Sequence, residues 1–360
     1  MSLDIQIQQN AAARSDQEVA QILADPGFGK HFTDHMFVAE WTPESGWHRA
    51  RIQPYGPFTL DPAAAVLHYA QEVFEGLKAF RHADGSVWTF RDQANAERMV
   101  RSAQRLALPV LDPADFNQAV DALIKVDQRW VPDATNEESL YVRPFMFASE
   151  AFLGVRPAHH VTFSVILSPA GPYFAGGIKP LTLWLSDDYT RAGRGGMGAA
   201  KTGGNYASSL VAQKAGMDQG CDQVVFLDCA EGRFVEELGG MNMFFVYDDG
   251  HIVTPALGTI LEGVTRSAVI KLAEERGHQV EERHYEISEW QQDAANGSLV
   301  EVFACGTAAV ITPVGKLKWR DGEVTMGTEP GKLTMELRQA LVDIQYGRSA
   351  DNFGWTRKVC

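Results

Sequence analysis

The sequence has few cysteines and no long apolar run, and both absences narrow the class of protein. Its 360 residues include four cysteines, which form no CxxC pair and have none of the spacing of a zinc site. We therefore expect neither a secreted disulfide scaffold nor a metal site. No stretch approaches the ~20 apolar residues of a membrane-spanning helix, and the N-terminus lacks the pattern of a signal peptide. The expected location is cytoplasmic, away from membranes.

Positive charge is also scarce. The chain has 32 Lys and Arg against 46 Asp and Glu, a formal net charge of −14, and no basic run. Proteins that bind nucleic acid concentrate Lys and Arg to neutralise phosphates, so nucleic acid is not an expected partner. The hydrophobic content of 45% is typical of globular proteins, and a chain of this length usually exceeds one hydrophobic core. These values predict an acidic globular protein with two lobes.

Glycine and proline concentrate in residues 169–180, PAGPYFAGGIKP, which we expect to be the loop between the lobes. Helices and sheet interiors accept these residue types poorly. The lobe before the loop, 1–168, is expected to be small and mixed α+β, and the lobe after it, 181–360, to be larger and rich in strands. Periodicity and turn signals predict a hairpin over 76–90, strands over 161–167 and 181–185, and helices over 92–108, 115–131, 265–277 and 332–347.

A single lysine lies within the glycine-rich stretch 191–213. Lys201 follows a run of small residues and precedes an expected helix, NYASSLVAQKAG. The Walker phosphate-loop pattern fails because Ala200 replaces the glycine before the lysine. The dinucleotide pattern GxGxxG fails because Lys201 replaces its third glycine. Such a lysine can act as an amine that forms a Schiff base with a carbonyl, although a solvated loop lysine is the alternative on this segment alone.

Three other segments favour a phosphorylated carbonyl cofactor. Gly263, Val264 and Thr265 open an expected helix, whose N–H groups and positive potential suit an anion. Residues 306–308, Gly-Thr-Ala, interrupt an apolar strand and offer backbone N–H groups and a hydroxyl. Each is also compatible with an ordinary helix start or strand glycine. Glu237 precedes two glycines and an apolar strand, so it needs a charged partner unless it is an exposed acid at a strand end.

Eight motifs, in order along the chain, resemble the branched-chain-amino-acid aminotransferases, a class IV family of pyridoxal phosphate enzymes with fold-type IV. They are LHYAQEVFEGLKAF, NAERMVRSAQRLALP, SLYVRP, SPAGPYF, KTGGNYASSL, EELGGMNMFF, LEGVTR and CGTAAVITPV. The resemblance implies a two-lobed α+β or α/β fold, pyridoxal 5'-phosphate as the cofactor and a homodimer. It also implies ping-pong transfer of the amino group between L-leucine, L-isoleucine or L-valine and 2-oxoglutarate.

The resemblance also implies a role for each matched residue. Lys201, the catalytic residue, would form the Schiff base with the cofactor and move a proton between the substrate Cα and the cofactor. Tyr206 would bond to the phenolic oxygen of the cofactor, and Glu237 would pair with its ring nitrogen. The implied phosphate-binding residues are Arg98, Gly263, Val264, Thr265, Gly306 and Thr307. The implied substrate-binding residues are Phe28, Tyr69, Phe74, Tyr141, Arg143, Val155, Tyr173, Gly240 and Ala308.

We expect the first lobe to supply Arg98 and much of the substrate pocket, and the second to supply Lys201 and Glu237. A D-amino-acid aminotransferase and an aminodeoxychorismate lyase share the scaffold and are the alternatives. The long N-terminal portion and the motifs SLYVRP and SPAGPYF count against both. A nucleotide-binding enzyme is disfavoured by the broken glycine patterns. A ligand-binding protein without catalysis is disfavoured by the intact set of Lys201, Glu237 and Arg98.

Overall fold

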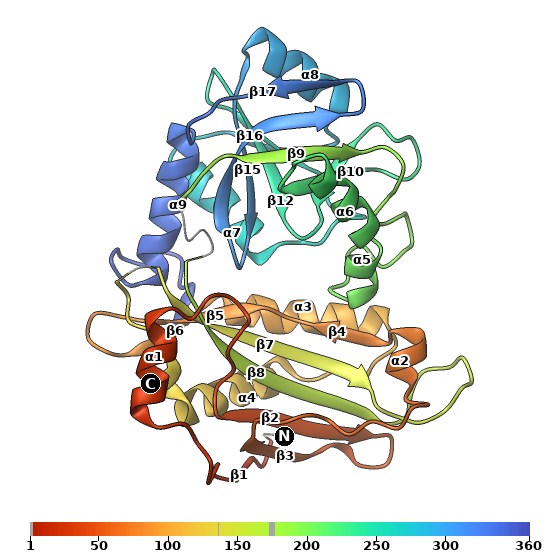
Figure 1. The fold of residues 1–360 in the computed structure, drawn as a ribbon, viewed down its shortest axis with the longest axis vertical. Helices are drawn as coiled ribbons and strands as arrows, with labels where there is room; N and C mark the ends of the chain where they lie inside the picture. Colours follow the sequence, from red (N-terminus) through yellow and green to blue (C-terminus); the bar gives the residue numbers. More distant parts are fainter. Residues whose placement is uncertain (1–2, 136, 173–176) are drawn as a thin grey trace. The chain divides into compact units, whose positions relative to one another are not determined.

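The computed structural model describes residues 3–135, 137–172 and 177–360, drawn as a ribbon in Figure 1. The chain divides into two units. Unit 1 consists of Met1–Tyr173, Ala200–Gly203 and Ile344–Cys360, and unit 2 of Phe174–Ala199 and Gly204–Asp343. Each unit contains strands and helices around its own sheet, which confirms the expected mixed, two-lobed fold class.

Unit 1 is built on a sheet of nine strands within the described residues, in the order β1-β3-β2-β8-β7-β5-β6-β18, with β4 paired to β7. Paired strands are antiparallel except for β1 and β3. The strands are β1 (Gln6–Ile7), β2 (His35–Thr42), β3 (Gly46–Pro54), β4 (Glu72–Phe74), β5 (Leu77–Arg81), β6 (Val87–Phe90), β7 (Ser139–Ala148), β8 (Val161–Ala170) and β18 (Thr356–Lys358). The antiparallel pair β5 and β6 confirms the expected hairpin.

The helices of unit 1 are α1 (Asp16–Ala24), α2 (Ala65–Tyr69), α3 (Asp92–Arg105), α4 (Pro113–Val126) and the short 3-10 helix η1 (Gln128–Trp130). Two of them, α3 and α4, confirm the helices expected over 92–108 and 115–131, although the second ends at Val126 instead of 131. The Asp112 side chain caps the start of α4 by accepting from the Ala114 N–H. Phe116, Val120 and Leu123 on α4 are fully buried, and α4 packs against β2 and β8. This helix and sheet core holds the site-bearing strands in place.

The central strand β7 separates core side chains from site side chains. Leu140, Val142 and Met146 are buried in the core, whereas Tyr141 and Arg143 alternate with them and are only partly buried. Successive side chains of a strand point to opposite faces of the sheet. Tyr141 and Arg143 therefore lie on one face.

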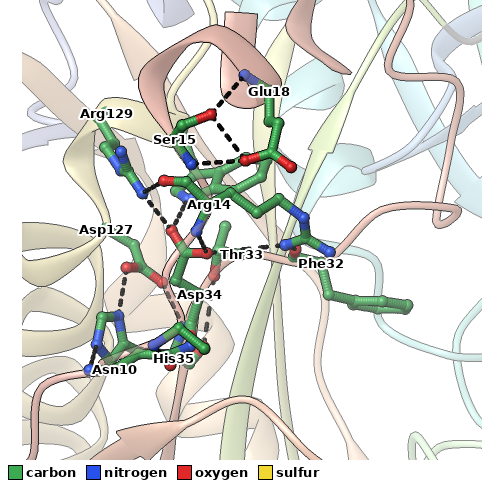
Figure 2. Close-up of polar contacts among 12 residues, drawn as sticks. Asn10, Arg14, Ser15, Glu18, Phe32, Thr33, Asp34, His35, Asp127 and Arg129 are labelled. Atoms are coloured by element: carbon green, nitrogen blue, oxygen red, sulfur yellow. Dashed lines mark hydrogen bonds and ion pairs between the residues drawn. The ribbon is translucent and has the colours of Figure 1, made fainter. Parts of the chain in front are cut away.

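A buried polar cluster fastens the N-terminal segment to unit 1 (Figure 2). The His35 ring has Nδ1 2.7 Å from Asp127 Oδ1 and accepts at Nε2 from the Asn10 N–H, at 2.9 Å. Asp34 accepts from Arg129 Nη2 and from Trp130 Nε1, both at 2.7 Å. Because these acceptors are buried and each has a donor, the segment is held without an unpaired buried charge.

Unit 2 is built on a second sheet, which has nine strands among the described residues, in the order β11-β10-β9-β16-β15-β12-β13-β14, with β17 paired to β16. β9 runs parallel to both of its neighbours, and β13 runs parallel to β14. The strands are β9 (Leu181–Ser186), β10 (Gln223–Leu227), β11 (Val235–Leu238), β12 (Asn242–Tyr247), β13 (Ile252–Pro255), β14 (Val280–Arg283), β15 (Leu299–Gly306), β16 (Val310–Trp319) and β17 (Gly322–Thr325). All six residues of β12 are buried, as an apolar run in a central strand predicts.

The remaining helices are α5 (Gly203–Ala207), α6 (Leu210–Asp218), α7 (Val264–Glu275), α8 (Ile287–Asn296) and α9 (Lys332–Gln345). α7 and α9 confirm two expected helices. The single helix expected after Lys201 is wrong, because the chain forms α5 and α6 with a break at Ser208 and Ser209. Their hydroxyls bond to the carbonyls of Asn205 and Tyr206, which offers the backbone an alternative to a continuous helix.

Two segments from the second half of the sequence, Ala200–Gly203 and Ile344–Cys360, belong to unit 1. The first of them corrects the expectation that the second lobe supplies Lys201. The Lys201 N–H donates to Ser102 Oγ on α3 at 2.9 Å. β18 pairs with β6 at the edge of the unit 1 sheet. For the rest of the chain, the expected boundaries of 1–168, 169–180 and 181–360 stay a prediction.

Two features are absent from the described residues. No helix there is long and apolar enough to cross a membrane. No group of three His, Cys, Asp or Glu side chains there is arranged to hold a metal ion. All four cysteines are free thiols.

Asp34→Asn should lower the free energy of unfolding at pH 7 by about 1.5–3 kcal/mol, because a neutral amide replaces the buried carboxylate that accepts from Arg129, Trp130 and the Arg14 N–H. Burial raises the pKa of Asp34, but bonds from Arg14, Arg129 and Trp130 outweigh it and lower the pKa below 3.8. The stabilisation is therefore present above that pH and is lost as the pH falls below it. Urea denaturation should show the difference shrinking below about pH 4.

Asp16→Asn is the matched control, because Asp16 pairs with the same Arg129 but its side chain is 96% exposed. Its effect should stay below about 1 kcal/mol. Equal losses in the two variants would contradict the role given to Asp34.

Candidate active site

The Lys201 segment is fixed to unit 1 by its backbone. The Phe74 N–H donates to the Lys201 carbonyl at 3.0 Å, and the Lys201 N–H donates to Ser102 Oγ. Glu72 accepts from the Thr202 hydroxyl at 3.2 Å and from the Gly203 N–H. β4 and α3 thus hold the backbone on both sides of Lys201, so the glycine-rich stretch delivers the lysine to a defined place.

The amine of Lys201 is surrounded by side chains that change its acidity. Its Nζ lies 4.8 Å from the centre of the Phe74 ring. Burial, followed by the Arg98 charge, lowers the pKa of Lys201 to about 8, against opposing contributions from Glu75 and Tyr141. About one amine in ten is then neutral at pH 7, far more than for an ordinary lysine. Lys201 is therefore able to act as a nucleophile and as a base near neutral pH.

Arg98 lies on α3 and is paired with Glu75, the residue after β4. Its Nε donates to Glu75 Oε1 at 2.7 Å, and its Nη2 donates to Oε2 at 2.8 Å. Both side chains are buried, at 5% and 0% exposure. The pair supplies a positive group of fixed orientation for an anion.

Phe74, Tyr141 and Arg143 gather beside Lys201. The Arg143 guanidinium lies over both rings, 4.8 Å from the centre of Phe74 and 5.3 Å from that of Tyr141. Its Nη2 donates to the Tyr141 hydroxyl at 3.0 Å. Phe28 contacts Tyr141 edge-on, with ring centres 5.1 Å apart. The group combines aromatic surface with a cation and a hydroxyl.

Two of the substrate residues expected in unit 1, Val155 and Tyr69, do not join this group. Val155 is 89% exposed, so its side chain lies in no apolar pocket. Tyr69 is 38% exposed and donates its hydroxyl to the Leu153 carbonyl. Tyr173 lies outside the described residues. Their substrate-binding roles stay predictions.

In unit 2, Glu237 on β11 has the charged partner that its buried position requires. Arg191 Nη1 lies 2.7 Å from Glu237 Oε1, and the two side chains are 1% and 2% exposed. Glu237 Oε1 also accepts from the Leu261 N–H at 3.1 Å. The carboxylate is thus oriented toward the loop that leads into α7.

The start of α7 is packed closely against the start of β12. Asn242 Nδ2 donates to the Leu261 carbonyl at 3.0 Å. A methyl group at Gly263 would lie 2.1 Å from Asn242 Oδ1, so only glycine fits there. Gly263 is the N-cap and no described side chain caps α7, whose first residues are Val264 and Thr265. The positive end of a helix in this setting suits an anionic group.

Tyr206, Gly240 and Gly306 lie together in unit 2. A methyl group at Gly240 would be 3.5 Å from Tyr206 Cε1, and one at Gly306 would be 3.6 Å from the Gly240 carbonyl oxygen. Thr307 and Ala308 form the turn between β15 and β16 directly after Gly306. The structure therefore brings these expected residues close to one another within unit 2.

No motif or spacing in the sequence predicts a role for Glu75 or Arg191. Both are buried ionic partners of predicted site residues, Arg98 and Glu237. The sequence indicates that Glu237 needs a cation nearby if it is buried. It does not indicate which one, because Arg191 lies many residues before Glu237 on a separate segment. The residues that follow Glu75, Gly76 to Lys78, form no pattern that would predict a contact between the Glu75 side chain and Arg98.

Comparisons with a family model, with curated proteins and with solved structures all point to aminotransferases. Residues 72–317 match the amino-transferase class IV family. The chain is 52% identical to the branched-chain-amino-acid aminotransferase of Mycolicibacterium smegmatis, covering 99% of this chain and 98% of that protein.

Two solved structures of branched-chain amino acid aminotransferases are also similar. The T.th. enzyme with pyridoxamine 5'-phosphate has a TM-score of 0.74 and 28% identity, covering 89% of this chain and 98% of that one. The enzyme from Escherichia coli has a TM-score of 0.72 and 27% identity, covering 91% of this chain and 99% of that one.

Acylation of Lys201 by acetic anhydride should rise with pH through a midpoint of about 8, because the pKa of the amine is lowered and only the neutral form reacts. Peptide mass spectrometry measures the rate, with the exposed Lys214 as an internal reference. A midpoint near the ordinary lysine value of about 10.4 would refute the environment described for Lys201.

Arg191→Met should destabilise the protein by about 3–5 kcal/mol, because it leaves the Glu237 carboxylate buried without a cation. Urea denaturation followed by fluorescence measures the loss. Arg320→Met is the control, since Arg320 pairs with Asp188 but is 59% exposed, and it should cost less than about 1 kcal/mol. A loss for Arg191→Met no larger than for the control would mean that Glu237 does not depend on Arg191.

Proposed function

Since the chain belongs to the class IV aminotransferases, in their branched-chain-amino-acid aminotransferase group, we propose that it transfers the amino group of L-leucine, L-isoleucine or L-valine to 2-oxoglutarate. The products are the branched 2-oxo acid and L-glutamate. The cofactor in this proposal is pyridoxal 5'-phosphate. The observation that carries the proposal is the Lys201 amine, whose pKa of about 8 suits it to nucleophilic and base chemistry.

The donor groups of the chain fit each polar part of this cofactor. Lys201 offers an amine for the aldehyde, and Glu237 offers a carboxylate for the ring nitrogen. Arg98 offers a guanidinium for the phosphate, together with the N-terminus of α7 and the hydroxyls of Thr265 and Thr307. Tyr206 offers a hydroxyl for the phenolic oxygen. The close approach of Gly263 to Asn242 also excludes a larger side chain at the N-cap of α7.

When bound, pyridoxal 5'-phosphate supplies an aldehyde that condenses with amines and a ring that accepts the electron pair of a broken Cα–H bond. Lys201 Nζ would hold the cofactor at its aldehyde. When released, the neutral Lys201 Nζ would take a proton from the substrate Cα and later return one. Phe74 and the backbone bonds on both sides of Lys201 limit where Nζ moves.

Arg191 is the buried cation beside Glu237, with Nη1 2.7 Å from the Glu237 carboxylate. A buried carboxylate without a cation is costly, and the ion pair offsets that cost. Glu237 would then hold the protonated ring nitrogen of the cofactor, which keeps the ring an electron acceptor.

The Phe74, Tyr141 and Arg143 group suits a site that takes two different side chains. Its aromatic rings offer apolar surface for a branched alkyl group. The Arg143 guanidinium and Tyr141 hydroxyl offer partners for the second carboxylate of 2-oxoglutarate. Phe28, Tyr69, Val155 and Tyr173 complete the proposed pocket, and backbone N–H groups at Gly240 and Ala308 hold the α-carboxylate.

The proposal extends to kinetics, assembly and location. The 2-oxo acid product leaves before the amino acceptor binds, so the kinetics are ping-pong. We also propose a homodimer, which light scattering tests as twice the mass of one chain, and a cytoplasmic location. No nucleic acid or membrane partner is part of the proposal.

Lys201→Ala should reduce L-leucine and 2-oxoglutarate turnover by at least about a thousandfold, because it removes both nucleophile and base. Borohydride treatment of the wild-type protein loaded with pyridoxal 5'-phosphate should attach the cofactor to Lys201, as peptide mass spectrometry would show. Lys214→Ala is the control and should retain full turnover, since Lys214 is exposed on α6.

A substrate panel separates this function from its rivals. L-leucine, L-isoleucine and L-valine should all react, and initial rates at several 2-oxoglutarate concentrations should give parallel double-reciprocal lines. Turnover of D-alanine or aminodeoxychorismate without L-leucine would overturn the proposal, as would attachment of the cofactor to another lysine.

A further inference from the structure

Glu75 is a fully buried acid with no role in the chemistry described so far. It lies between β4 and β5, and its side chain has no exposed surface. Its N–H donates to the Pro144 carbonyl at 2.7 Å, which ties the residue to β7. A buried carboxylate is costly unless several donors compensate it, so its position calls for an explanation.

Four N–H donors converge on the Glu75 carboxylate. Arg98 donates through Nε and Nη2, at 2.7 and 2.8 Å. Asn95 donates to Oε2 at 2.8 Å from the preceding turn of α3, and the Gly76 N–H donates to Oε2 at 3.2 Å. A bidentate contact of this kind fixes the plane of a guanidinium, because both oxygens and both nitrogens must stay in line.

The same carboxylate balances charge around Lys201. Burial raises the pKa of Glu75, but the charge and hydrogen bonds of Arg98, the Lys201 charge and the Asn95 hydrogen bond together outweigh it and hold the pKa below its ordinary value. Glu75 therefore stays ionised at neutral pH. Arg98 lowers the pKa of Lys201, whereas Glu75 raises it. Loss of the Glu75 charge would leave the Arg98 cation uncompensated beside the amine.

We propose that Glu75 is a positioning residue of the cofactor site: it holds the Arg98 guanidinium in one orientation for the phosphate and offsets the Arg98 charge beside Lys201. This inference rests on the proposed function, because the phosphate belongs to pyridoxal 5'-phosphate. Glu75 itself touches neither substrate nor cofactor in this proposal and acts through Arg98.

Glu75→Gln keeps the size of the side chain but removes the charge and replaces one acceptor by a donor. Affinity for pyridoxal 5'-phosphate, measured by absorbance titration of the cofactor-free protein, should fall about tenfold. Affinity for pyridoxal, which has no phosphate, should change less than twofold. The acylation midpoint of Lys201 should move down by about one pH unit from its wild-type value.

Two further variants distinguish orientation from charge. Glu75→Asp keeps the charge on a shorter arm, so it should weaken pyridoxal 5'-phosphate binding but leave the Lys201 midpoint within about 0.3 pH units of wild type. In an Arg98→Met background, Glu75→Gln should cause no further loss of phosphate-dependent affinity, since Glu75 acts through Arg98. This double variant also lacks an unpaired buried charge, so it remains testable if Glu75→Gln folds poorly.

Asp92→Asn is the matched control. Asp92 is a buried acid on the same helix, and it accepts from Arg357 Nε at 2.7 Å. Thermal denaturation should show that it costs stability, while both cofactor affinities and the Lys201 midpoint stay unchanged. A merely structural role for Glu75 would give the same result as this control.

The outcomes separate the two proposals. If wild-type protein binds pyridoxal 5'-phosphate at Lys201 but Glu75→Gln keeps both the affinity and the midpoint, the inference on Glu75 is overturned and the proposed function stands. Equal losses for pyridoxal and pyridoxal 5'-phosphate would also overturn it. If wild-type protein does not bind pyridoxal 5'-phosphate at Lys201, the proposed function itself fails.

Discussion

Unit 1 brings two cationic side chains, Arg98 and Lys201, close together in surroundings with little water, and this is tolerated only because the Glu75 carboxylate lies beside them. Like charges in a low-dielectric environment repel strongly. The bidentate Arg98–Glu75 pair offsets part of the Arg98 charge. Burial and the Arg98 charge lower the pKa of Lys201 to about 8, and Glu75 opposes that fall. The acidity of the Lys201 amine thus depends on a carboxylate that has no reacting role in the proposed function.

Unit 2 applies the same physical rule with the signs exchanged. There the group with the proposed role is the Glu237 carboxylate, and its buried ionic partner is the Arg191 guanidinium. Each pair is almost completely buried, so removal of either partner leaves a charge that solvent does not screen. The net charge of −14 therefore has little bearing on the local chemistry. The local chemistry depends instead on the opposite charge with which each buried charge is paired.

Periodicity and motifs in the sequence predict much of this structure, but they do not predict which buried charges pair with each other. The α4 face of Phe116, Val120 and Leu123 follows directly from helical spacing, and the β5–β6 hairpin from its Asp-Gly turn. Glu75 and Arg191 were missed because side-chain pairing across distant segments leaves no local pattern. The break between α5 and α6 was missed because helix propensity does not register the competing Ser208 and Ser209 bonds. Membership of Lys201 in unit 1 is a tertiary property that spacing does not encode.

The assignment of Ala200–Gly203 to unit 1 also constrains how this protein can be divided or rearranged. The backbone passes from one unit to the other four times, after residues 173, 199, 203 and 343. No single cut separates the chain into two complete units, and neither unit can be encoded as one continuous gene fragment. Loss of either half of the chain would separate Lys201 from its supporting strand and helix. Lys201 lies on a short segment of unit 1 that is flanked on both sides by chain of unit 2. Neither unit can therefore be passed on in evolution as a continuous piece of sequence without the other.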